Sequence, residues 1–143
     1  MTNEEVEHIL RTLPEIEANT DLFAATFYER FFEQWPETRE LVTPDVTERN
    51  RLLVDEFIGI ASLVSDLDAF VARAHELGAR HRAQGAAREH YALVEPAIMS
   101  ALAAVLGDRW CGATASAWHR LHQLMAETML EGSTGAAFVP RKR

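Results

Sequence analysis

The sequence has few of the features that mark a secreted, membrane or nucleic-acid-binding protein. Its 143 residues include a single cysteine, Cys111, which excludes a disulfide within the chain. Acidic residues outnumber basic ones and give a formal net charge of -8, which argues against nucleic acid or an anionic membrane as the main partner. The N-terminus is acidic and amphipathic and lacks the basic start of a signal peptide. These features favour a cytoplasmic location.

Long hydrophobic runs and strand-like patterns are also missing. The longest apolar stretch, AIMSALAAVL, is too short to span a bilayer, so we expect no membrane partner. No segment alternates polar and apolar residues for long enough to predict a strand. No repeat or linker divides the sequence. We therefore expect a single domain over residues 1–143, with 132–143 as a flexible C-terminal tail.

Helical spacing of apolar residues accounts for most of the chain. The first expected helix has Asn3 as its cap, and the second, at 22–35, closes before Pro36. The third is expected at 47–64, with Leu52 and Leu53 on its apolar side. A fourth helix is expected to begin at Asp66, a fifth to stop at Gly107, and the last to cover 115–130. The sequence therefore predicts an all-α domain of roughly six to eight helices.

One apolar stripe ends in a histidine. Phe70, Ala74 and Leu77 precede His81 by eleven, seven and four residues, which places all four on one face of a helix. Gly85, in the stretch ARHRAQGAAREHY, is expected to stop this helix. An imidazole at the end of a buried stripe is either a hydrogen-bonded core histidine or a ligand.

A second unusual feature is a helix rich in aromatic residues. Six of the twelve aromatics of the chain lie between Phe23 and Trp35. The hydroxyl of Tyr28 lies among apolar neighbours and needs a partner. In one interpretation this is a core helix whose tyrosine bonds a backbone carbonyl. In the other interpretation, Tyr28 faces a flat ligand. If that ligand is haem, His81 and Tyr28 belong to one site, because a histidine would hold the iron from one side and a polar group would face a bound gas on the other.

Other kinds of site find no support in the sequence. There is no nucleophile elbow, phosphate-binding glycine loop or basic stripe with aromatics between the charges. No pair of histidines has the spacing of a zinc site. His122 lies on the buried stripe of the last helix, where it faces either a ligand or a core hydrogen-bond partner. The remaining histidines are interpreted as surface or capping residues: His8, His75, His90 and His119.

Several motifs in order resemble one protein family. They are TFYERFFEQWPETREL, ARHRAQGAAREHY, VLGD at 105–108 and the pair Ala117–Trp118. Over residues 1–131 the chain resembles single-domain bacterial globins of the Vitreoscilla haemoglobin type and the globin domain of flavohaemoglobins. The resemblance implies a globin fold, with helices packed around a haem pocket. Because the sequence has no CxxCH motif, the implied cofactor is haem b.

The resemblance also implies roles for individual residues. His81 matches the proximal ligand, which binds the iron through Nε2 while the other ring nitrogen donates to an acceptor. Tyr28 matches the distal residue that donates a hydrogen bond to a bound gas. Tyr91 matches a tyrosine that joins a hydrogen-bond network around the proximal histidine.

The third helix is implied to supply the remaining distal residues. Counting back from His81 places Leu53 at the apolar distal position and Arg49 at the polar one, and Phe57 lines the pocket a turn later. The stretch between Val42 and His81 is about three residues shorter than in the family, so the loop after the third helix is expected to differ. Asn50 and Arg51 therefore remain alternatives to Arg49 as the inward group.

Other departures from the family concern the haem edge and the proximal side. Val42 stands where globins place a phenylalanine against the haem, so a stacked ring is lost there. The glutamate of the family's proximal network falls at Ser133, and Glu131 or Glu127 are the candidate substitutes. Pro96 lies where a helix should be running, which predicts a kink or a late start.

The implied function is reversible binding of oxygen, nitric oxide or carbon monoxide at a His81-ligated iron. One alternative is a nitric oxide dioxygenase, which would need an electron-supplying reductase as partner because 143 residues leave no room for a flavin domain. Another is a haem-free globin fold acting as a signalling or interaction domain. The chain is expected to be a monomer or a homodimer.

Overall fold

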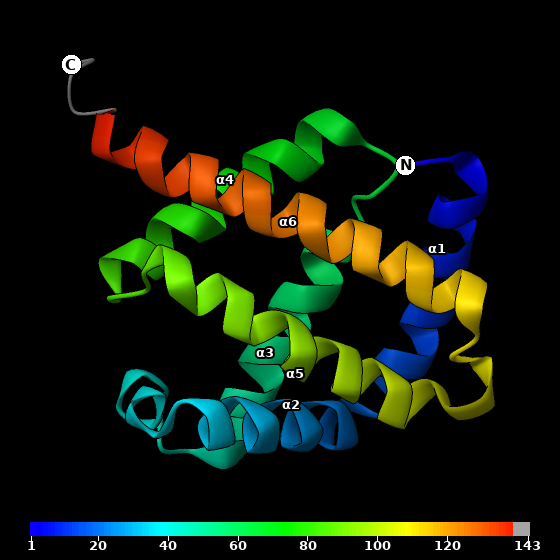
Figure 1. Cartoon of the computed structure of the whole chain (residues 1–143), viewed down its shortest axis with the longest axis horizontal. Coiled ribbons are helices and arrows are strands. Elements are labelled where there is room, and N and C mark those ends of the chain that lie inside the picture. Colours follow the sequence, from blue (N-terminus) through cyan, green and yellow to red (C-terminus); the bar gives the residue numbers. More distant parts are fainter. Residues whose placement is uncertain (139–143) are drawn as a thin grey trace.

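The computed structural model describes residues 1–138, and these residues form helices joined by short connections (Figure 1). The elements in chain order are α1 (Asn3–Ala18), α2 (Thr20–Gln34), the 3-10 helix η1 (Pro36–Leu41), α3 (Val46–Ala61), α4 (Leu67–Ala83), α5 (Arg88–Leu106), the 3-10 helix η2 (Gly107–Arg109) and α6 (Gly112–Phe138). Among residues 1–138 there is no strand. The all-α prediction is confirmed.

Most helix boundaries follow local signals in the sequence. α4 begins after Asp66, whose carboxylate accepts a hydrogen bond from the Ala69 amide. α4 is followed, as expected, by Gly85 in the left-handed region at φ 100°. The expected cap of α1 was wrong by one residue. Thr2, rather than Asn3, caps this helix through reciprocal hydrogen bonds with Glu5.

Two helix pairs have the most extensive contacts: α4 packs along α6, and α2 packs along α5 (Figure 1). Two glycines permit the close approach of α4 and α6. A Cβ atom at Gly78 would lie 2.0 Å from the backbone oxygen of Met129, and one at Gly132 would lie 2.4 Å from the backbone of His75. A side chain at either position would therefore separate the helices. This packing fixes α4, the helix that carries His81, relative to the last helix.

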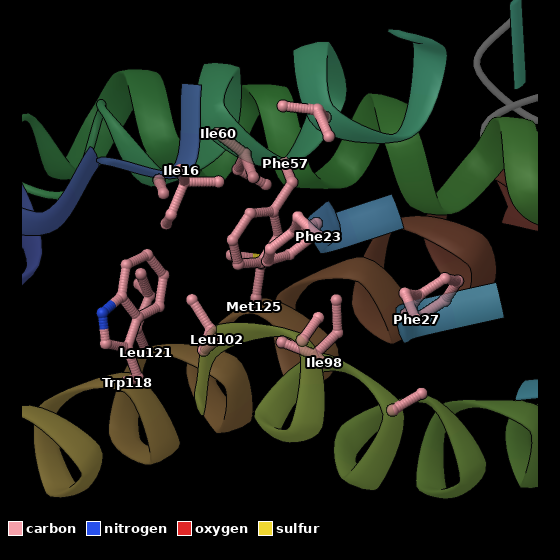
Figure 2. Close-up of a cluster of buried hydrophobic side chains, with 14 of the residues drawn as sticks. Ile16, Phe23, Phe27, Phe57, Ile60, Ile98, Leu102, Trp118, Leu121 and Met125 are labelled. Atoms are coloured by element: carbon pink, nitrogen blue, oxygen red, sulfur yellow. The ribbon is translucent and has the colours of Figure 1, made fainter. Parts of the chain in front are cut away.

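The core is formed by side chains of all six α-helices of the described residues, and Figure 2 shows part of it. The rings of Phe57 and Trp118 stack with centroids 5.4 Å apart, which joins α3 to α6. Trp118 Nε1 donates to Thr12 Oγ1 at 3.1 Å, so the one polar atom of this buried indole has a partner. Leu52, expected on the apolar side of its helix, is 45% exposed because α3 turns its neighbour Leu53 inward instead.

The last two long helices differ from the expectations. α5 begins at Arg88, well before Pro96, so the helix does not start late. By length and composition alone, Arg88–Arg109 would suffice to cross a membrane, although its AIMSALAAVL stretch would not. Core helices of soluble proteins pass the same test, and six residues of α5 are buried. α6 continues to Phe138, past the expected start of a tail at 132, while 139–143 lie outside the described residues.

Candidate functional site

Tyr28 lies on the inner side of α2, held by neighbouring rings of the same helix. Its ring packs edge-on against Phe27 with centroids 5.0 Å apart and stacks on Phe32 at 5.4 Å. The side chain is buried, and burial raises the pKa of its hydroxyl, with the nearby Arg49 acting in the opposite direction. The expected bond to a backbone carbonyl is not found among the described residues. A protonated hydroxyl therefore remains available as a donor.

Arg49 of α3 faces Tyr28. The central carbon of its guanidinium lies 4.2 Å from the centroid of the Tyr28 ring and 5.7 Å from that of Phe32. Its Nε is buried without a hydrogen-bond partner in the described structure. The alternatives point elsewhere: Asn50 donates to Asp21 at 3.4 Å, and Arg51 is exposed and pairs with Glu48 at 2.8 Å. Among these three neighbours, Arg49 is the group turned toward Tyr28.

The expected apolar pocket residues occupy different environments. Leu53 and Val42 are partly buried and pack against the core. Phe57 is buried between Phe23 and Trp118, with ring centroids at 5.1 and 5.4 Å, so it is a core residue joining three helices.

His81 ends the predicted stripe of α4, in which Phe70, Ala74 and Leu77 are buried as expected. Its Nδ1 lies 2.9 Å from the carbonyl oxygen of Leu77. Because a carbonyl only accepts, Nδ1 carries the proton and Nε2 keeps a free lone pair. Burial lowers the pKa of His81, and the bond to Leu77 acts in the opposite direction. His81 is thus a neutral imidazole whose free nitrogen suits a metal.

Tyr91 of α5 borders a cavity of about 120 Å³ between the end of α4 and the last turns of α6. Its hydroxyl oxygen is buried and has no hydrogen-bond partner in the described structure. Ser133 lines the same cavity but donates to the Leu130 carbonyl of its own helix at 2.8 Å. Neither candidate glutamate lines this cavity, and Glu131 instead lies 3.3 Å from His75 at the surface. The structure therefore places no carboxylate beside Tyr91 within the described residues.

The other histidines mostly have the surface and capping roles expected of them. His90 Nδ1 accepts from the Ala87 amide at the start of α5, and His119 lies 2.7 Å from a carboxylate oxygen of Glu95. His122 is the exception. It is 8% exposed, and neither ring nitrogen has a hydrogen-bond partner in the described part of the chain. The expected core hydrogen bond is thus not present there.

The residues fit a haem group on two observations. His81 offers one free ring nitrogen while the other is held by a carbonyl, the arrangement typical of a metal-bound histidine. Tyr28 offers a buried, protonated hydroxyl with no protein partner among the described residues. Sequence reasoning placed His122 on a buried stripe but could not tell that neither ring nitrogen has a hydrogen-bond partner in the described structure, because that depends on contacts between helices. It missed Arg82 and Arg88, which line the cavity beside Tyr91.

Comparisons with known proteins agree on one family. A family model described as Globin matches residues 25–129. The chain is 23% identical over 133 residues to a flavohemoprotein of Bacillus subtilis (strain 168), a match that covers 91% of this chain and 33% of that protein. This chain thus spans about a third of the length of that relative.

Solved structures show the same fold. An engineered carbene transferase from Rhodothermus marinus is similar with a TM-score of 0.83 and 20% identity, and the match covers 99% of both chains. A bacterial globin from Campylobacter jejuni is similar with a TM-score of 0.82 and 20% identity, over 94% of this chain and 97% of that one. At these identities the likeness concerns the fold alone.

Proposed function

Because this chain belongs to the globin family, we propose that it binds haem b and holds oxygen, nitric oxide or carbon monoxide reversibly. His81 is the proposed axial ligand and Tyr28 the proposed distal donor. The observation that carries the proposal is the hydrogen bond from His81 Nδ1 to the Leu77 carbonyl, since it leaves Nε2 free and fixes the direction of the ring. Val42, Leu53, Phe57 and Tyr91 are proposed as the surrounding cofactor-binding residues.

Haem, when bound, supplies an iron with a coordination position open to a diatomic gas. The residues of the chain supply the iron ligand and the hydrogen-bond donor. His81 stays neutral at physiological pH because its burial lowers its pKa, so its Nε2 does not lose the lone pair to a proton. Tyr28 keeps its proton because burial raises its pKa, so its hydroxyl can donate to a gas with partial negative charge.

Arg49 is proposed to keep Tyr28 in place. Its guanidinium lies over the Tyr28 ring, and the side chain reaches there from a neighbouring helix. A cation over the ring face favours one ring position without using the hydroxyl, which stays available to the ligand. Arg49 thus acts as a positioning residue through Tyr28.

Oxidation of nitric oxide by oxygen to nitrate is a second candidate function. The match to a flavohemoprotein over most of this chain, but only a third of that protein, favours it. The conversion of nitric oxide and oxygen to nitrate consumes one electron per nitrate, so sustained turnover would need a supply of electrons. The proposed partner is therefore a separate reductase, and the test is nitric oxide consumption that needs both the chain and a reductase.

The first experiment is an absorption spectrum of the protein expressed with added haem precursor, in the ferric, reduced and carbonyl forms. We expect a strong Soret band in the wild type and its loss or shift in His81→Ala. The matched control is His75→Ala on the same helix, because His75 is exposed and lies beside Glu131. This control should keep the wild-type spectrum.

Two results would contradict the proposal. A folded wild-type protein without a Soret band would favour a haem-free interaction domain. A Soret band that His81→Ala leaves unchanged would assign the iron to another ligand. Far-UV circular dichroism of each variant separates loss of haem from loss of fold.

A further inference from the structure

The cavity of about 120 Å³ beside Tyr91 is lined by residues from the end of α4, the start of α5 and the C-terminal part of α6. Its polar lining consists of Arg82, Arg88, Tyr91 and Ser133, and small apolar side chains complete the wall. The volume is well above the roughly 10–15 Å³ that a single water needs. The cavity therefore has room for a small polyatomic molecule.

The charges around this cavity are of one sign. Arg82 and Arg88 form no ion pair with any described residue, and none of the residues that line the cavity is acidic. Arg30, Arg39 and Arg49 are likewise outside the ion pairs of the described residues, but Arg82 and Arg88 are the two that line one cavity. Six other arginines pair with carboxylates: Arg11, Arg51, Arg73, Arg80, Arg109 and Arg120. Two unpaired guanidinium groups at one cavity attract an anion.

The hydroxyl of Tyr91 supplies a third donor. Its oxygen is buried and unpartnered in the described structure, which is costly unless something in the cavity accepts its proton. The hydroxyl of Ser133 does not meet this need, since it donates to the Leu130 carbonyl at 2.8 Å. Burial also raises the pKa of Tyr91, so the phenol keeps its proton and can donate.

We propose that this cavity binds a small oxyanion, a carboxylate or a phosphate, held by the guanidinium groups of Arg82 and Arg88 and by the hydroxyl of Tyr91. Guanidinium groups match the planar edge of a carboxylate and two oxygens of a phosphate. The proposal shares Tyr91 with the proposed cofactor-binding residues, but it uses neither the proposed iron ligand His81 nor the proposed distal donor Tyr28, so it can be tested with and without bound haem. Haem content, read from the Soret band, is therefore recorded separately.

Calorimetric titration of the full chain at constant ionic strength tests the proposal, with inorganic phosphate and acetate as probes and chloride as the reference ion. We expect one site per chain for phosphate or acetate and none for chloride. Tyr91→Phe should weaken binding about tenfold, the effect of one hydrogen bond to a charged group. Arg82→Gln and Arg88→Gln should each weaken it about tenfold as well. Preference between the two probes distinguishes the two oxyanion sources.

Arg30→Gln is the matched control, because Arg30 is exposed on α2 and lies outside the cavity. It should bind the probe as the wild type does. A probe that binds all variants with equal affinity would place the ion elsewhere and overturn the proposal, as would the absence of binding. Thermal unfolding gives a second readout, in which a given probe concentration should raise the Tm of the wild type more than that of Tyr91→Phe. A Tm of the wild type that the probe leaves unchanged would also overturn it.

Discussion

Buried polar side chains in this protein fall into two groups. Thr12 and Trp118 satisfy each other across α1 and α6 through a hydrogen bond of 3.1 Å. Tyr91 and His122 have buried polar atoms without a hydrogen-bond partner in the described structure. An unpartnered buried polar group is costly, so native proteins keep few of them. The hydrogen bond between Thr12 and Trp118 stabilises the fold. The hydroxyl groups of Tyr91 and of Tyr28, which also has no partner in the described structure, are the groups proposed to contact ligands.

Thr12→Val tests the first group. The change keeps the shape of the side chain but leaves the buried Trp118 N–H without an acceptor, so we expect a loss of about 1–3 kcal/mol in the free energy of unfolding. Urea unfolding followed by circular dichroism measures it. Thr20→Val is the control, since the Thr20 hydroxyl bonds the Glu17 carbonyl at an exposed position. Equal losses of unfolding free energy in the two variants would show that the hydrogen bond from Trp118 to Thr12 does not add to stability beyond that of an exposed threonine.

Tyr28→Phe tests the proposed distal donor. Removal of the hydroxyl should raise the oxygen dissociation rate of the haem-loaded protein about tenfold or more, the effect of one hydrogen bond to a partly charged group. Stopped-flow displacement of oxygen by carbon monoxide measures this rate. Trp35→Phe, which removes the Nε1–H that donates to Glu37 on the outer part of the molecule, should leave it unchanged. An unchanged rate in Tyr28→Phe would mean that the hydroxyl does not reach the gas.

Pairs of helices, rather than single helices, set the geometry of the site. α4 carries His81, and its backbone approaches α6 closely at Gly78 and Gly132. α2 carries Tyr28, and α3 brings Arg49 over its ring. The positions of the proposed ligand and donor thus depend on how their helices pack against neighbours.

Gly78→Ala tests the contact between α4 and α6. An added methyl would lie 2.0 Å from the Met129 carbonyl oxygen, and backbone cannot move aside as a flexible side chain does. We expect a loss of about 1–3 kcal/mol in the free energy of unfolding, despite the helix propensity of alanine. Gly112→Ala, at a position with open space, should change it by less than about 0.5 kcal/mol. Equal stability of the two variants would contradict the observed approach.

Over the whole molecule, an acidic surface surrounds a core that contains one buried histidine without a partner in the described structure. The formal net charge is -8. Burial lowers the pKa of His122, while Glu95 nearby raises it and His119 lowers it. The folded protein therefore keeps His122 neutral at a pH where the unfolded chain would already protonate it.

Burial lowers the pKa of both His81 and His122, so both contribute to the pH dependence of stability. A lowered pKa in the folded state means that the unfolded state binds more protons below about pH 6.5, so stability is present above that pH and falls as the pH drops. Below about pH 6.5 the wild type should lose stability, with up to about 1.4 kcal/mol per pH unit from His122. His122→Leu should show a shallower fall in urea unfolding at each pH. Parallel curves would assign the acid sensitivity to other groups.

Local sequence patterns were sufficient to predict the helices. The stripe of α4, its cap at Asp66 and its stop at Gly85 each depend on residues within a turn or two, and all three were predicted. The family and the all-α fold followed from such patterns and from motif order. The cap of α1 was missed by one residue because Thr2 and Asn3 are both good capping residues.

Contacts between helices settled what local patterns left open. The sequence alone does not show which of Arg49, Asn50 and Arg51 faces inward. Only the approach of α3 to α2 places Arg49 over the Tyr28 ring. The cavity beside Tyr91 likewise exists because three helices end near one another. Helix formation depends on hydrogen bonds and spacing over four residues, which a sequence displays directly. The side of a helix that meets a partner depends on residues far away in the chain, whose arrangement appears only after packing.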